Sequence, residues 1–209
     1  MKSLLMTASL LGSWKYLLEC NEDYFESTLE EFKTTLKRMP IQDNEAMQNG
    51  REFEDRVREK CDKNFRTMLA PLAENDFEYA GCISECAEEC SGGIWQQKAS
   101  KLVNVSGIDF LLYGRLDVLK GPWIIDLKFS KTFEVGKYHN APQTKMYLEL
   151  VPEPVGMKYL VCDGSTLYLD EYRRNDVGSI MDDVLDFWSW LGAYPELKAL
   201  YIDNWESKY

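Results

Sequence analysis

The chain has 209 residues, 45% of them hydrophobic and 13% aromatic, so it is long enough for one well-packed core and we expect a single domain over residues 1–209. Its formal net charge of −11 argues against general binding to duplex DNA, because that binding comes largely from lysine and arginine neutralising phosphates. No stretch reaches the roughly 18 to 20 apolar residues that a membrane-spanning helix needs, so we expect a soluble protein without a membrane partner.

Residues 1–91 are predicted to be mostly helical. Apolar residues recur at helical spacing over residues 3–36, 45–72 and 76–91, and Gly92-Gly93 then end the third helix. The leucine-rich start resembles a short signal peptide, but Trp14 and Lys15 interrupt its apolar run. We therefore expect a folded N-terminal helix and a cytoplasmic location.

Three of the six cysteines form a stripe along the third predicted helix. Cys82, Cys86 and Cys90 recur every four residues, which favours small apolar side chains buried in the core of a reduced protein. Metal or cluster binding is an alternative. A disulfide is a weaker one, because the chain shows no secretory context.

Residues 92–209 are predicted to contain the sheet and further helices. Strands are expected from Ile94, over 107–118 and over 123–129, and a second hairpin joins 156–162 to 166–172 across Asp163-Gly164. Helices follow over 176–191 and after Pro195, and we expect the aromatic C-terminal segment to pack in the core. This pattern predicts an α/β fold with a central mixed sheet flanked by helices.

The hairpin over 107–129 carries charged residues within an otherwise apolar sequence. Lys120-Gly121-Pro122 form the turn, and a loop of about four residues there would place Asp117 opposite Asp126. Strand alternation puts Lys128 on the same face as Asp126. Facing carboxylates repel each other, and Mg²⁺ or Mn²⁺ would compensate, since these ions use oxygen ligands and often only one or two carboxylates. Lys128 could then orient or deprotonate a water or stabilise charge on a phosphate. The alternative is an ordinary solvated strand face.

A predicted helix that begins near Pro142 follows the hairpin. Gln143 and Tyr147 lie four residues apart and share one face of it, where an amide and a phenol could hold a phosphate, a base edge or Lys128. An exposed amide and a half-buried ring would be the ordinary reading. The same region is more basic than the rest of the chain and includes Arg115, Lys128, Lys131, Lys137, His139 and Lys145. With one histidine in the chain, neither a zinc site nor a Ser-His-Asp hydrolase is favoured.

Three segments occur in an order and spacing that resemble the RecB-like branch of the PD-(D/E)XK nuclease superfamily. They are Gly114-Arg115-Leu116-Asp117, Asp126-Leu127-Lys128, and Gln143-Thr144-Lys145-Met146-Tyr147. The resemblance spans about residues 50–173. It implies a restriction-endonuclease-like core and a Mg²⁺- or Mn²⁺-dependent DNA nuclease, an exonuclease acting on DNA ends in phage or bacterial recombination, repair or defence.

The same resemblance implies roles for individual residues. Asp117, Asp126 and Lys128 would form the catalytic set, and Glu54, four residues after Gly50, would complete the metal site, with Glu52 as the alternative. The residues expected to bind substrate are Gln143, Tyr147, Arg115, Lys131 and Lys145.

The resemblance also suggests partners, and it raises the question of an iron–sulfur cluster. Some RecB-like nucleases hold an iron–sulfur cluster through one N-terminal cysteine and three near the C-terminus. This chain lacks that C-terminal trio, so no cluster is expected. Expected partners are DNA ends or single strands, and a phage recombination or single-strand-binding protein. The alternative function is a non-catalytic member of the same fold that uses its acidic surface to bind or inhibit a basic partner.

Overall fold

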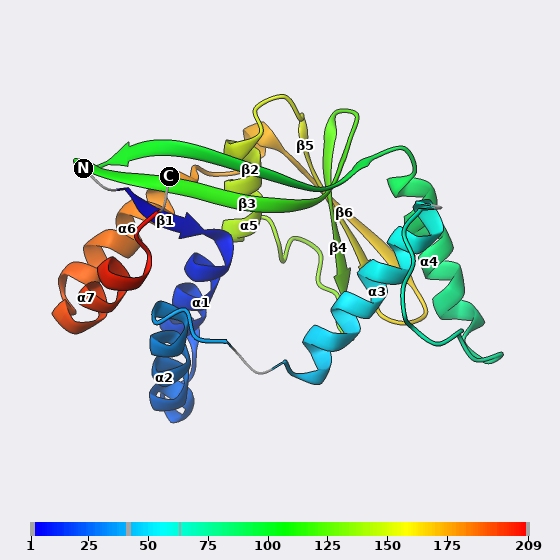
Figure 1. Ribbon diagram of the computed structural model, residues 1–209, viewed down its shortest axis with the longest axis horizontal. Coiled ribbons are helices and arrows are strands. Elements are labelled where there is room, and N and C mark those ends of the chain that lie inside the picture. The colour runs from blue at the N-terminus through cyan, green and yellow to red at the C-terminus, as the bar shows by residue number, and fades with distance from the viewer. Residues whose placement is uncertain (1–2, 41–42, 63, 208–209) are drawn as a thin grey trace.

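The computed structural model describes residues 3–40, 43–62 and 64–207. Within these ranges a six-stranded mixed sheet has the order β1-β3-β4-β5-β6, and β2 pairs with β3 off this path (Figure 1). β1 with β3 and β4 with β5 are parallel, and the other neighbours are antiparallel. The strands are β1 Leu4–Thr7, β2 Ile94–Val105, β3 Ile108–Lys120, β4 Trp123–Phe129, β5 Gly156–Cys162 and β6 Leu167–Arg173.

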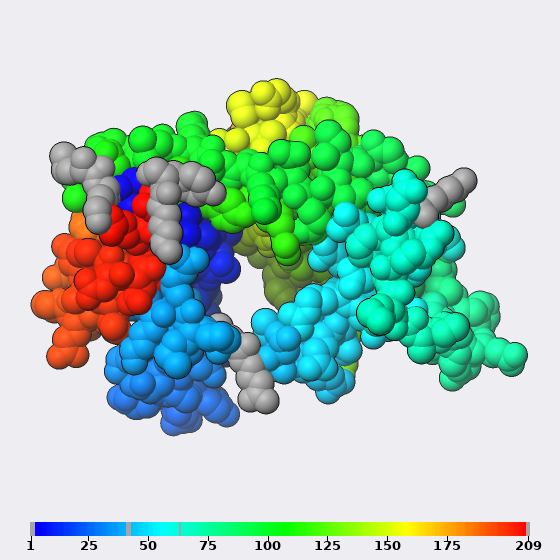
Figure 2. Space-filling model, viewed as in Figure 1, coloured from blue at the N-terminus to red at the C-terminus, as the bar shows by residue number. Residues whose placement is uncertain are grey.

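Helices cover both faces of this sheet, which confirms the predicted α/β class with a mixed sheet flanked by helices. They are α1 Ala8–Glu19, α2 Phe25–Leu36, α3 Glu45–Cys61, α4 Phe77–Cys90, α5 Pro142–Leu150, α6 Ile180–Gly192 and α7 Pro195–Asn204, with short 3₁₀ turns at Glu22–Tyr24 and Arg174–Asp176. Figure 1 shows α1, α2, α6 and α7 grouped at one end of the molecule and α3 with α4 at the other. In Figure 2 an opening separates the two groups below the sheet.

Two hydrophobic clusters lie on the opposite faces of the central strands. The larger one packs the sheet against α1, α2, α5, α6 and α7, and the smaller one packs it against α3 and α4. β4 contributes to both, because Ile124 belongs to the larger cluster and Ile125 and Leu127 to the smaller. Alternation along β4 therefore puts Asp126 and Lys128 on one face, as the sequence predicts, and that face is the one covered by the larger cluster.

Three predicted helix boundaries are wrong. Residues 4–7 form the strand β1 instead of the start of a helix, because α1 begins only after Thr7, whose hydroxyl accepts from the backbone N–H of Leu10. The helix expected over 45–72 ends at Cys61, and 64–76 has no regular element; Lys63 lies outside the described residues. The helix expected from 176 begins at Ile180, since Ser179 caps it.

The helix expected over 76–91 is α4, and its cysteine stripe packs in the smaller cluster. Cys82, Cys86 and Cys90 are buried, and all six cysteines of the chain are free thiols. Burial raises the pKa of Cys90 to about 12, so its thiol stays protonated at neutral pH. The prediction that these side chains fill the core is confirmed. The C-terminal aromatic segment is also core, with Tyr201 and Trp205 buried.

Among the described residues, no helix has the length and apolar character that crossing a membrane would require.

Candidate active site

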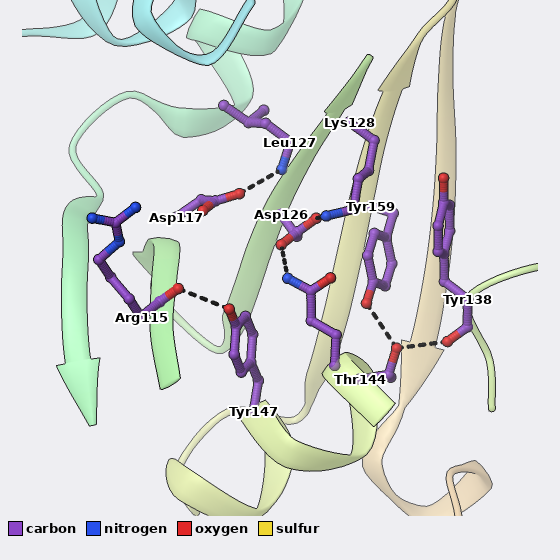
Figure 3. Close-up of polar contacts among 10 residues, drawn as sticks. Arg115, Asp117, Asp126, Leu127, Lys128, Tyr138, Thr144, Tyr147 and Tyr159 are labelled. Carbon is purple, nitrogen blue, oxygen red and sulfur yellow. Dashed lines mark hydrogen bonds and ion pairs between the residues drawn. The ribbon is translucent and has the colours of Figure 1, made fainter. Parts of the chain in front are cut away.

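The β3–β4 hairpin brings the two predicted carboxylates together. Its ladder begins at the turn with Lys120 opposite Trp123 and ends with Val118 opposite Ile125, so Asp117 and Asp126 are the next facing positions. Beyond the last pair, the Oδ2 atom of Asp117 accepts the backbone N–H of Leu127, at 3.1 Å (Figure 3). The carboxylates are therefore neighbours across the two strands, at the end of the regular pairing.

Asp126 is the most deeply buried acid of this group and is held from two sides. Its Oδ1 atom accepts from Nε2 of Gln143 at 2.6 Å, and its Oδ2 atom lies 2.7 Å from Nζ of Lys128. Apart from this ion pair, Oδ2 has no hydrogen-bond partner. Asp126 is 0% exposed, whereas the Lys128 side chain keeps 31% exposure. Figure 3 shows Lys128 directed toward Asp126.

Tyr147 fixes α5 against the middle of β3. Its hydroxyl donates to the backbone oxygen of Arg115 at 2.8 Å, and its ring packs over Gly114. A Cβ atom added at Gly114 would lie 2.8 Å from Cε1 of Tyr147 and 2.9 Å from Cδ1 of Leu150. Glycine therefore allows the close approach of α5 that places Gln143 beside Asp126.

Gly114→Ala is expected to lower the free energy of unfolding by about 1–3 kcal/mol, because the new methyl group overpacks the contact between β3 and α5. Urea unfolding followed by circular dichroism measures this change. Gly81→Ala, in α4 with no atom within 4 Å of the added Cβ, is the matched control and should be neutral or stabilising. Equal stability of Gly114→Ala and wild type would contradict the close packing.

Glu54 approaches Asp117 and Asp126 from α3, which packs in the smaller hydrophobic cluster. Its Oε1 accepts from Nε2 of Gln96, and burial, partly offset by Arg115, raises its pKa, with further repulsion from Asp126. Glu52 instead pairs with Arg56 on the surface of α3, at 2.7 Å. Of the two candidate glutamates, Glu54 is the one that lies toward the pair of aspartates.

The site carries more acid than base. Burial and then repulsion by Asp126 and Glu54 raise the pKa of Asp117 well above its ordinary value. Burial alone would lower the pKa of Lys128, but Asp126 and Asp117 outweigh it and raise the pKa, so Lys128 is an ammonium at neutral pH. This arrangement does not favour the hypothesis that Lys128 deprotonates a water.

These donors suit a hard divalent cation in kind. Asp117 and Asp126 supply adjacent carboxylate oxygens, and the buried Oδ2 of Asp126 has capacity for another partner. In the described ranges no three His, Cys, Asp or Glu side chains are close enough to share one ion. The fit is therefore to an ion held by one or two carboxylates and otherwise by water and substrate.

A cavity of about 550 Å³ opens beside these residues. Its walls come from the start of α1, the middle of β3 and the start of α5, and include Thr7, Ser9, Gly12, Tyr113, Arg115, Asp117, Tyr138, Gln143 and Tyr147. The residues of α1 were not among the predicted site residues. The Thr7-Ala8-Ser9 segment is a helix-start signal, but the predicted helix from residue 3 obscured it.

Tyr138 is a second wall residue without a sequence signal. Its ring stacks on Tyr159 with centroids 4.3 Å apart, and its backbone oxygen accepts from the hydroxyl of Thr144 at 2.6 Å. Thr144 also shares a 2.8 Å hydrogen bond with the hydroxyl of Tyr159 (Figure 3). The loop before α5 is thereby fixed to β5 next to the cavity.

Two lysines expected to bind substrate lie elsewhere. Lys145 Nζ pairs with Oδ1 of Asp183 at 3.0 Å, and its side chain is only 11% exposed. It points away from Gln143 because residues two positions apart on a helix do not share a face. Lys131 is exposed after β4 and lines a separate hollow with the start of α3, at 44–49. None of these contacts brings either lysine to Asp117 or Asp126. We therefore do not propose a substrate role for the two lysines.

The raised pKa of Asp117 predicts a pH-dependent stability. Between its ordinary value near 4 and the raised value, the folded chain binds a proton that the unfolded chain has released, so stability falls as pH rises through this window. Asp117→Asn keeps the acceptor for Leu127 and is expected to raise Tm at pH 7 in EDTA, by about 2–4 °C for each kcal/mol of strain removed. Calorimetry from pH 5 to 8 should show a flatter profile for the variant. Parallel profiles would contradict the prediction.

No protein-family model and no curated protein sequence matches the chain. Several solved structures resemble it, and two of them do so at low identity. SSO0001 is 13% identical, with 90% of this chain and 75% of that chain covered and a TM-score of 0.47. LHK-Exo, solved in complex with dAMP, is 16% identical, with 97% of this chain and 92% of that chain covered and a TM-score of 0.42. Both TM-scores are below 0.5, so neither likeness assigns a function.

Proposed function

We propose that this protein is a Mg²⁺- or Mn²⁺-dependent deoxyribonuclease that acts at DNA ends. The observation that carries the proposal is the buried Asp126, held between Gln143 and Lys128 and adjacent to Asp117 across the hairpin. Burying like charges side by side is costly, and function is the ordinary reason for such a cost. The resemblance of the three sequence segments to RecB-like nucleases supports the same reading.

Each residue has a proposed part in phosphodiester hydrolysis. Asp117 and Asp126 would hold a divalent cation, which when bound polarises the phosphate, and Glu54 would contact it through water. Lys128, already an ammonium, would stabilise negative charge on the phosphate oxygens. Gln143 keeps Asp126 in place through its 2.6 Å hydrogen bond.

Two further residues would position the substrate. Arg115 is exposed on β3 and lines the cavity, where its guanidinium can bind a phosphate. Tyr147 also lines the cavity, but its hydroxyl is already committed to the backbone of Arg115. We propose that Tyr147 sets the position of β3 and offers its ring edge to the strand, and that its hydroxyl does not bind DNA.

The shape of the cavity supports action on a strand end. A volume of about 550 Å³ is typical of sites for small ligands, and it suits a terminal nucleotide better than the side of an intact duplex. The net charge of −11 supports the same preference, since it disfavours extended contact with duplex phosphates.

Digestion of end-labelled linear DNA and covalently closed circular DNA tests the proposal, with duplex and single-stranded forms of each. Loss of linear DNA alone, in Mg²⁺ or Mn²⁺ and not in EDTA, is the expected result. Cleavage of the circles would replace the end-dependent reading with an endonuclease. No cleavage of any form in either metal would overturn the enzyme proposal and leave the acidic binding protein as the surviving alternative.

A further inference from the structure

Gln96 has an unusual backbone conformation for its place in the fold. Of the described non-glycine residues, Arg38, Gln96 and Ser106 have φ above zero. Arg38 follows the end of α2 and Ser106 lies in the turn between β2 and β3, where a left-handed residue is ordinary. Gln96 has φ of 54° inside β2, where no turn requires it. A strained residue inside a strand needs another reason.

The strain is located opposite Asp117. In the ladder between β2 and β3, Trp95 pairs with Val118 and Gln97 pairs with Leu116. Gln96 therefore lies opposite Asp117, and these two residues do not form a ladder pair. The side-chain alternation of β3 changes phase at this point. Leu112 and Leu116 belong to the larger hydrophobic cluster, whereas Val118 belongs to the smaller one. The distortion at Gln96 therefore coincides with the change in direction that brings Asp117 to the end of the hairpin ladder.

The side chain of Gln96 connects to the third carboxylate. Its Nε2 donates a hydrogen bond to Oε1 of Glu54, which joins β2 to α3. Its Oε1 atom is buried and has no hydrogen-bond partner. A buried amide oxygen without a partner is costly, and water or a cation normally satisfies it. Amide oxygens are accepted ligands of hard divalent cations.

We propose that Gln96 is a positioning residue of the cation site: its Nε2 holds Glu54 toward Asp117 and Asp126, and its Oε1 supplies a neutral oxygen to a hydrated divalent cation. The inference rests on the proposed function and adds to it a residue outside the three sequence segments. The left-handed backbone is what directs the side chain of a residue facing Asp117 toward Glu54.

Gln96→Gly separates this role from a structural one. Glycine adopts a positive φ without strain, so the variant is expected to melt within a few degrees of wild type. Removing a residue that orients Glu54 beside the hydrated cation and supplies the cation with an oxygen is expected to weaken Mn²⁺ binding by about 10–100-fold. Isothermal titration of the metal-free protein with MnCl₂ measures binding without any assay of cleavage, and calorimetry gives Tm.

Gln97→Gly is the matched control, because Gln97 is exposed, is the same residue type and lies at the next position of β2 with regular pairing. Its Tm should fall, since glycine weakens a strand, and its Mn²⁺ affinity should equal that of wild type. If Gln96→Gly melts far below wild type, Gln96→Asn replaces it. Asparagine tolerates a left-handed backbone but is too short by one methylene group, and the same loss of Mn²⁺ affinity is expected.

The outcomes distinguish this inference from the proposed function. Mn²⁺ binding that is lost in Asp126→Ala, weakened in Gln96→Gly and unchanged in Gln97→Gly supports it. Mn²⁺ binding that Asp126→Ala abolishes but Gln96→Gly leaves unchanged overturns the role of Gln96 and keeps the cation site. A wild-type protein that binds no Mn²⁺ overturns both.

Discussion

Asp126→Asn is expected to reduce DNA cleavage by about 10³-fold at saturating Mg²⁺ or Mn²⁺, while the variant remains folded. The substitution keeps the shape of the side chain and an oxygen that can accept from Gln143, and it removes the charge that lies 2.7 Å from Lys128. A neutral amide in place of the buried carboxylate weakens cation binding and leaves the ammonium without its counter-ion. The measurement is the initial rate on end-labelled linear DNA, together with Tm.

Asp109→Asn is the control for this experiment. Asp109 lies in the same strand β3, where its carboxylate accepts from Asn104 at 2.6 Å, outside the cavity wall. This variant should cleave DNA at the wild-type rate. A wild-type rate for Asp126→Asn would show that the buried carboxylate has no part in the reaction.

Lys128→Met is expected to produce two separate losses. The rate of cleavage should fall by about 10²–10³-fold, because a cation close to the phosphate is removed. The free energy of unfolding in EDTA should fall by about 3–5 kcal/mol, because Asp126, 0% exposed, is left without its partner. Rates and urea unfolding curves measured on the same preparation give both numbers.

The double variant Asp126→Asn/Lys128→Met separates the two effects. Removing both charges relieves the buried imbalance, so much of the lost stability should return. Activity should not return, since both proposed functions are absent. Recovery of cleavage in the double variant would mean that the single variants act only through folding.

The hairpin at the centre of the site could be predicted from the sequence because its signals are local. Apolar alternation, the Gly121-Pro122 turn and the constant register across it determine which residues face each other over a few positions. β4 occupies 123–129 as predicted. The ladder ends with Val118 opposite Ile125, so the same register puts Asp117 opposite Asp126. The position of Glu54 came from the family resemblance, and its proximity to Asp117 and Asp126 comes from the packing of α3.

Other parts of the site depend on contacts between residues far apart in the chain, which local sequence patterns do not predict. The residues of β1 form an apolar run that suits a strand or a helix equally, and only pairing with β3 decides between them. Lys145 lies in a helix rich in site residues, yet a buried acid on α6 pairs with it. Gln96 is an ordinary glutamine in an alternating segment, and its backbone conformation arises from the distortion opposite Asp117.

The two hydrophobic clusters make the candidate site depend on two separately packed halves of the molecule. Asp117, Asp126 and Gln143 belong to the hairpin and to α5, whereas Glu54 arrives on α3, which packs through the smaller cluster by contacts such as that of Phe53 with Phe129. Cooperative units of different stability open independently in many proteins. A transient opening of α3 and α4 would withdraw Glu54 from the carboxylates while the larger cluster stayed intact. Amide hydrogens in α3 would then exchange with solvent faster than those in β4, and the activity of a warmed sample would decline before its main melting transition.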